Sequence, residues 1–148
     1  MDDSCVIQVK DGDLELAMIV RSTFRKEGIA FFTADSYSQQ LGYMNRAQGY
    51  FIPPHVHNPV SRQVSYTQEV LFIRSGLVRV DFYTESREYL ESALLYPGDV
   101  ILLARGGHGF VMLEASEIIE VKQGPYAGDQ DKTRFVSTPE ENIVLRYS

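Results

Sequence analysis

Short apolar runs separated by turn residues occupy most of this chain. In residues 77–83, apolar side chains at alternate positions are separated by Arg79, Asp81 and Tyr83. This two-residue period is typical of a strand with one buried and one exposed face. The same reasoning predicts further strands at residues 6–9, 14–20, 29–32, 41–46, 50–57, 69–74, 93–96, 100–103, 110–114 and 117–123.

Glycine, proline, aspartate and serine residues interrupt these runs at short intervals, for example at residues 75–76, 97–99 and 105–107. Many short strands with such turns predict an all-β barrel or sandwich. A helix start is indicated near the C-terminus, where Thr138 as N-cap precedes Pro139 and Glu141. We expect one short helix there at most.

The composition is that of a soluble globular domain. The chain has 148 residues, of which 44% are hydrophobic and 23% charged, enough to close a hydrophobic core. A net charge of -6 and a pI of about 5.0 argue against a general attraction to nucleic acid or to an anionic membrane. Cys5 is the single cysteine and cannot form an intrachain disulfide, and neither a signal peptide nor a membrane-spanning run is evident. We therefore expect a cytoplasmic protein.

Three histidines and one glutamate indicate a metal site. His55 and His57 are one residue apart on a predicted strand, so their side chains leave the same face. Glu69 and His108 each open a later apolar run. Three imidazoles and one carboxylate suit a divalent first-row metal such as Zn, Mn, Fe or Ni, whose identity the ligands do not decide. A single histidine is more often a surface or core residue, so the hypothesis depends on all four converging.

Around these residues the sequence resembles the cupin superfamily, whose fold is a jelly-roll barrel, also called a double-stranded β-helix. The first cupin motif has the form G-x5-H-x-H-x(3,4)-E-x6-G. It is matched by Gly49, His55, His57, Glu69 and Gly76. The departure from the motif is that eleven residues, instead of three or four, separate His57 from Glu69. This polar insertion is a lid or, more simply, a long hairpin.

The second cupin motif, G-x5-P-x-G-x2-H-x3-N, is similar to the stretch that begins at Gly98. Ala104 replaces the proline, Gly106 is present, His108 comes one residue early, and the asparagine is missing. The resemblance covers residues 41–124. It implies one cupin domain over residues 1–148, with N-terminal strands in residues 1–40 and a C-terminal extension in residues 125–148. A homodimer is expected, because cupins often pair through sheet edges and exposed edges need covering.

Residues 119–135 are similar to a segment in the cupin domain of bifunctional mannose-6-phosphate isomerase/mannose-1-phosphate guanylyltransferases. That segment reads IEVQ-x-G-x-Y-L-G-E-D-D-I-V-R-F, and its spacing is kept by Gly124, Tyr126, Gly128 and Arg134. In that family the arginine is implicated in the isomerase reaction, so the resemblance assigns a catalytic role to Arg134. No nucleotidyltransferase domain is recognised in the chain, so only the isomerase half carries over.

The resemblance thus implies a metal-dependent, isomerase-like enzyme of carbohydrate or surface-polysaccharide metabolism, with a sugar or sugar phosphate as its substrate. The metal would polarise the substrate carbonyl while a proton moves between C1 and C2. The sequence does not identify the general base. Tyr50, Tyr66 and Glu114 are titratable and lie near motif strands, but packing or surface roles are the simpler interpretation.

Three other functions stay open, because one scaffold hosts many chemistries. An Fe(II)-dependent dioxygenase or other oxidoreductase would use the same four ligands. A non-catalytic sugar- or metabolite-binding protein would hold its ligand without turnover. A metal-free sugar-nucleotide epimerase or ketoisomerase would use a histidine as base and would not need four converging ligands.

Basic residues that could hold a phosphate lie just beyond the last core strand. Arg134 would bind it bidentately and Lys132 as a point charge, although a solvated terminal segment is an equally good interpretation. Arg46 and Lys122 are further basic candidates, which we interpret as surface residues.

Overall fold

The computed structural model describes residues 5–148, whose regular structure is β-strand apart from two short 3-10 helices. The chain divides into two compact units. The main unit takes residues 5–24 and 66–148, and the inserted unit takes Arg25–Ser65. The prediction of an all-β fold is confirmed, whereas the sheets are not closed into a barrel. None of the helical segments in residues 5–148 has the length and apolar character needed to span a bilayer.

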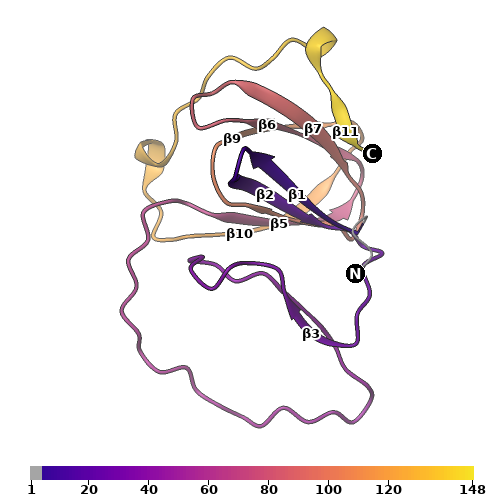
Figure 1. Cartoon of the computed structure of the whole chain (residues 1–148), viewed down its shortest axis with the longest axis vertical. Coiled ribbons are helices and arrows are strands. Elements are labelled where there is room, and N and C mark those ends of the chain that lie inside the picture. Colours follow the sequence, from indigo (N-terminus) through magenta and orange to yellow (C-terminus); the bar gives the residue numbers. More distant parts are fainter. Residues whose placement is uncertain (1–4) are drawn as a thin grey trace. The chain divides into compact units, whose positions relative to one another are not determined.

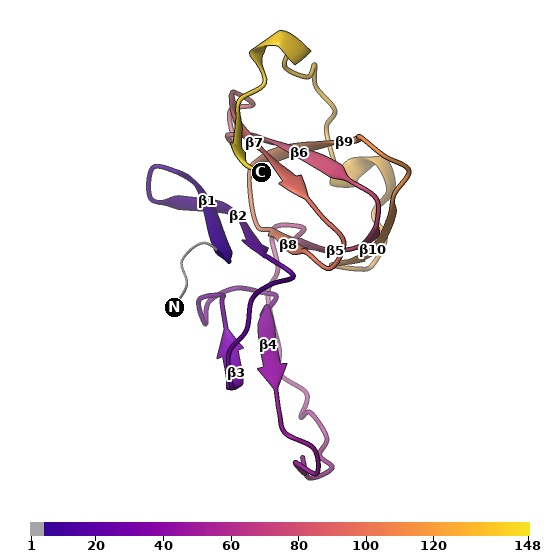
Figure 2. The same cartoon turned by 90° about the vertical axis from the view of Figure 1, so that its right-hand side faces the viewer.

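Two sheets face each other in the main unit (Figure 1), and the view turned by 90° shows the same two layers (Figure 2). The first sheet has the order β1-β2-β8-β5-β10 and the second β11-β7-β6-β9. Their strands are β1 (Val6–Asp11), β2 (Leu14–Val20), β5 (Glu69–Ser75), β6 (Val78–Tyr83), β7 (Tyr89–Leu95), β8 (Val100–Leu103), β9 (Gly107–Met112), β10 (Glu117–Lys122) and β11 (Leu145–Tyr147). The strands predicted in residues 6–20 and 69–123 are therefore found, with bounds shifted by a few residues.

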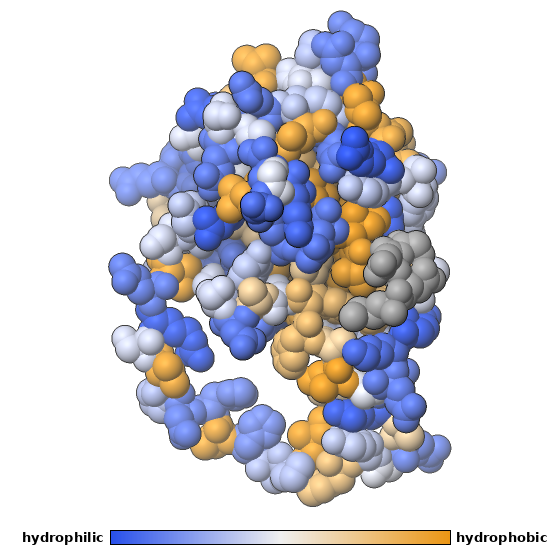
Figure 3. All heavy atoms as spheres, in the orientation of Figure 1, coloured by the Kyte–Doolittle hydropathy of each residue, from blue (hydrophilic) through white to orange (hydrophobic). Residues whose placement is uncertain are grey.

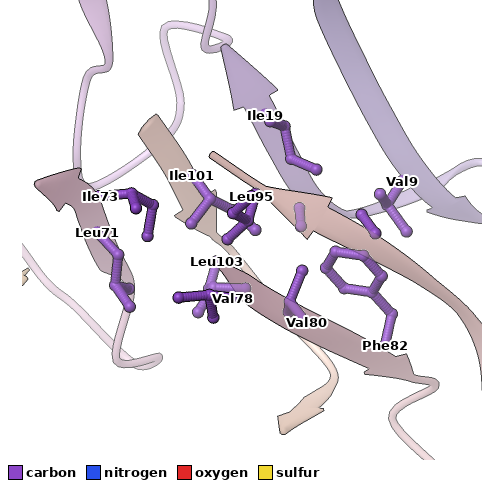
Figure 4. Packing of buried hydrophobic residues seen from close by; sticks show 12 residues of the cluster. Val9, Ile19, Leu71, Ile73, Val78, Val80, Phe82, Leu95, Ile101 and Leu103 are labelled. Atoms are coloured by element: carbon purple, nitrogen blue, oxygen red, sulfur yellow. The ribbon is translucent and has the colours of Figure 1, made fainter. Parts of the chain in front are cut away.

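The hydrophobic core fills the space between these sheets. Ile73 and Ile101 come from the first sheet, and Val80, Phe82 and Leu95 from the second, and each is at most 1% exposed. Figure 4 shows their side chains gathered between the strands. Burial of this apolar area is the main source of stability for such a two-layer structure.

Strand β6 is buried on both faces, which corrects the prediction that its alternate residues are exposed. Arg79, Asp81 and Tyr83 are 7%, 5% and 4% exposed. The Arg79 guanidinium donates to Asp81 Oδ1 at 2.8 Å and to Glu140 Oε1 at 2.5 Å, and Ser92 Oγ also donates to Asp81. Apolar and polar residues do alternate along β6, but this pattern could not reveal that the C-terminal residues cover its second face.

The C-terminal residues contain η1 (Gly128–Asp131), η2 (Glu140–Asn142) and the short strand β11, which pairs in parallel with β7. A short helix was predicted near Thr138, but the prediction that its side chain forms the N-cap is wrong. The Thr138 N–H instead donates to the Tyr83 hydroxyl at 3.0 Å. Contacts with β6, including the ion pair of Glu140, determine the path of this segment.

The inserted unit contains the antiparallel strands β3 (Gly28–Phe31) and β4 (Gly42–Asn45), which confirm two predicted strands. Residues 51–65 have no regular structure, so the strand predicted over residues 50–57 is wrong. Pro53 and Pro54 cannot donate backbone hydrogen bonds, and a ladder is correspondingly difficult to form there. Figure 3 shows apolar side chains between hydrophilic ones along this extended part of the chain, where Phe51 and Val56 are 73% and 85% exposed.

Candidate functional site

Glu69 is the first residue of β5 and lies on the inner face of its sheet. Leu71 and Ile73 follow it at two-residue intervals and belong to the hydrophobic core. Because alternate side chains of a strand leave the same face, Glu69 points toward the space between the sheets. The two-residue period of the predicted strand therefore accounts for the inward direction of this carboxylate.

His108 is the second residue of β9 and lies on the inner face of the opposite sheet. It is directly across from the core residue Phe82 in the β6–β9 ladder, and its ring centroid is 5.5 Å from that of Phe110. The preceding Gly107 has no side chain, and a Cβ atom there would lie 2.8 Å from Phe135 Cζ. Close packing by Phe135 thus accounts for a glycine immediately before the histidine.

The two side chains meet between the sheets. His108 Nε2 is 3.2 Å from Glu69 Oε2, and the side chains are 28% and 15% exposed. The hydrogen bond from His108 lowers the pKa of the Glu69 carboxyl below its ordinary value, and the charges of Lys122 and Lys132 act in the same direction against the effect of burial. Glu69 is therefore a carboxylate at neutral pH, as a metal ligand or an electrostatic anchor must be.

Further charged side chains surround this pair. Lys122 lies directly across from Glu69 in the β5–β10 ladder and forms an ion pair of 3.1 Å with Glu120. The charge of Asp131 contributes to raising the pKa of Lys122, after the larger effect of Glu120. Asp131 also accepts a hydrogen bond of 2.6 Å from Thr67, the residue two positions before Glu69. Strand β10 and the chain that follows it thus bring both signs of charge to this end of the sandwich.

The other two predicted ligands, His55 and His57, lie in the inserted unit. Although they are not on a strand, their rings are neighbours, with centroids 5.3 Å apart and planes at 73°. His55 Nδ1 is 3.0 Å from the carbonyl oxygen of Pro53. This contact leaves Nε2 of His55 as its available donor atom for a metal.

The structure thus brings the four predicted ligands together as two pairs, one in each unit. Within either unit, the described residues contain no group of three or more His, Cys, Asp or Glu side chains that could hold a metal ion. Each pair nevertheless has the donor chemistry that a divalent first-row ion uses, since one supplies imidazole and carboxylate and the other two imidazoles.

Arg134, predicted from the resemblance to be catalytic, is exposed, and its side chain makes no hydrogen bond or ion pair within residues 5–148. The next residue, Phe135, is held against the main unit, with its ring centroid 5.0 Å from that of Tyr83. The backbone at Arg134 is therefore fixed next to a residue that contacts Gly107, while its guanidinium is free to bind an anion.

The other residues considered for the site have simple surroundings. The guanidinium of Arg46 lies over the ring of Tyr50, with Cζ 4.4 Å from the ring centroid. The guanidinium of Arg105 lies over the ring of Tyr66 in the same way, at 5.0 Å. Glu114 is exposed in the turn that follows β9. Packing and surface roles account for all of them, and none is brought next to Glu69 or His108 by a hydrogen bond or ion pair within residues 5–148.

Sequence reasoning missed two groups of charged residues. The buried Arg79–Asp81 pair has a signal in the sequence, because opposite charges two residues apart on a strand share one face. Glu120 and Lys122 carry the same signal and share a face with core residues, as the register of β10 shows.

Comparisons of the chain with models of protein families, with curated proteins and with solved structures gave no match. The class that the structure defines is accordingly an all-β protein of two facing sheets with a polar cluster at one end.

Proposed function

We propose that this chain is a metal-dependent enzyme of the cupin type, most like the sugar-phosphate isomerases, acting in carbohydrate or surface-polysaccharide metabolism. The observation that supports it is the contact between Glu69 and His108. These residues come from facing sheets, and both lie on the inner face, where a jelly-roll metal site would be built.

In this proposal the metal would be held by His55, His57, Glu69 and His108. A divalent ion, when bound, supplies polarisation of a substrate carbonyl. The fit is supported by the ionised carboxylate of Glu69 and by the adjacent rings of His55 and His57.

The substrate would be a phosphorylated sugar, and this chain's own basic residues would orient it. Arg134 offers a guanidinium without a competing carboxylate within residues 5–148, and guanidinium suits the geometry of a phosphate. The general base of the isomerisation stays unassigned, since within residues 5–148 no titratable candidate forms a hydrogen bond or ion pair with Glu69 or His108 apart from these two themselves.

A single cupin domain of the jelly-roll type over residues 1–148, a homodimer and a cytoplasmic location are parts of the same proposal. Support for dimerisation comes from β9 and β10, each of which pairs on one side only within residues 5–148. Unpaired strand edges are usually covered by another strand or another copy of the chain. Cys5 is the one cysteine in the sequence and forms no disulfide within the chain, which agrees with a reducing compartment.

The test begins with elemental analysis of protein purified without added metal. We expect a stoichiometric metal that is lost in His57→Ala and in His108→Ala but retained in Glu114→Gln, the matched control at an exposed carboxylate. Wild-type protein should then exchange solvent deuterium into fructose 6-phosphate or mannose 6-phosphate.

Other outcomes would contradict parts of the proposal. Metal- and substrate-dependent oxygen uptake without deuterium exchange would replace the isomerase by an Fe(II)-dependent dioxygenase. Saturable ligand binding without turnover would indicate a non-catalytic sugar- or metabolite-binding protein. Deuterium exchange that persists in metal-free protein would favour a histidine base without a metal.

A further inference from the structure

Strand β10 carries charged side chains on a face that is otherwise apolar. In its ladder with β5, Ile118 lies across from Ile73, Glu120 across from Leu71, and Lys122 across from Glu69. Residues paired across an antiparallel ladder project to the same face. Glu120 and Lys122 therefore point to the inner side of the sheet, in line with core residues.

An edge strand can carry an inward charge simply to prevent pairing with another chain. Here the charges are part of a larger arrangement. Lys122 lies directly across the ladder from Glu69, and Asp131 accepts a hydrogen bond from Thr67, two residues before Glu69. Protection of an edge needs one charge on one strand, and it does not need an ammonium directly across from the carboxylate of the Glu69–His108 pair.

The ammonium of Lys122 is available to a ligand. Its side chain and that of Glu120 are 35% and 43% exposed. An ion pair with this exposure is weak, because water screens both charges. A phosphate oxygen can therefore replace the Glu120 carboxylate at Lys122 with little loss, whereas a neutral sugar offers no such exchange.

We propose that Lys122 is an anion-binding residue of the Glu69–His108 site, in addition to Arg134, and that Glu120 holds its ammonium when no ligand is bound. The ligand class is a phosphorylated sugar or another small phosphate ester, which rests on the proposed function. This replaces the interpretation of Lys122 as a surface residue. Glu120 acts as the competing anion, so its removal strengthens ligand binding.

The test measures binding by calorimetry, with inorganic phosphate, fructose 6-phosphate and unphosphorylated fructose as probes. Lys122→Gln should weaken fructose 6-phosphate binding at least tenfold and leave fructose unchanged. Glu120→Gln should tighten binding of both phosphates severalfold, and the double variant should behave like Lys122→Gln. Lys10→Gln, at an exposed lysine of β1, is the matched control and should change nothing.

Lys122→Arg preserves the charge and should retain most of the affinity, which keeps the test informative if Lys122→Gln does not fold. Equal affinity in Lys122→Gln and wild type, or no anion binding by the wild type, overturns the proposal. Binding is measured without turnover, so the two proposals can fail separately. If the wild type binds phosphate through Lys122 but has no isomerase activity, only the proposed function is refuted. Isomerase activity with Lys122-independent binding refutes this inference alone.

Discussion

His108 Nε2 and Glu69 Oε2 lie 3.2 Å apart, on strands of opposite sheets. Neither residue is near the other in the sequence. Each reaches this position because an apolar residue on its own strand fixes which face points inward: the core residue Leu71 for Glu69, and Phe110, which packs against the core, for His108. The contact is therefore a property of the sandwich packing, and it would be lost if either strand shifted by one residue.

Metal binding should order the segment that carries the two other histidines. Residues 51–65 have no regular structure, so their amides are expected to exchange rapidly with solvent. Coordination by His55 and His57 would restrict the backbone and slow exchange in residues 51–58. Hydrogen exchange with mass spectrometry, with and without zinc, measures this effect. His57→Ala is the control, and equal exchange in both states of the wild type would argue against these ligands.

Gly76 should be far less tolerant of alanine than Gly12. Both have positive φ, +88° and +59°, but a Cβ at Gly76 would collide with Ser116 and with the Ala115 carbonyl oxygen, whereas a Cβ at Gly12 meets nothing within 4 Å. Gly12→Ala should therefore cost only the left-handed backbone penalty, about 1–2 kcal/mol. Gly76→Ala should lower the free energy of unfolding further, and denaturant unfolding would show it. Equal losses would contradict the close approach.

Phe82 should be among the most sensitive core positions. Its side chain is 1% exposed and packs within the cluster between the sheets. Phe82→Ala should reduce the free energy of unfolding by about 3–5 kcal/mol through lost burial and the cavity left behind. Val136→Ala, at a side chain that is 92% exposed, should have almost no effect. Urea titrations of both variants give the comparison, and similar midpoints would exclude this core.

Acidification should weaken the attachment of the C-terminal residues to β6. The hydrogen bond from Arg79 lowers the pKa of Glu140 below its ordinary value of 4.5. The ion pair therefore stabilises the folded state above that value, and the contribution is lost as the pH falls through the lower, folded-state pKa. Glu140→Gln should melt below the wild type at pH 7 and approach it at acid pH. Thermal unfolding across this range tests the sign, and a difference that grows on acidification would refute it.

Most of the fold could be predicted from local patterns. Turn residues and apolar alternation correctly predicted β5 and β10, because these strands pack one face on a core, and they predicted β6 as a strand without revealing that its second face is covered. The strand over His55 and His57 was predicted from the same pattern, but Pro53 and Pro54 remove the donors that a ladder needs. Strand β11 has only three residues and depends on its parallel pairing with β7, so no local signal reveals it.

The candidate site was predicted in part for a related reason. The inward direction of Glu69 follows from strand period, and its contact with His108 was predicted from their roles as ligands. The inward direction of Glu120 and Lys122 depends on the register of β10 against β5. That register is a pairing between distant segments, which a two-residue period alone does not determine.

The covering of β6 by the last residues of the chain has a practical consequence for anyone who prepares this protein. A polypeptide ended after β10, where the motif resemblance stops, would leave the Arg79 guanidinium and the Asp81 carboxylate facing water and would remove the Thr138 N–H that donates to the Tyr83 hydroxyl. Residues 125–148 should therefore be kept in any shortened version.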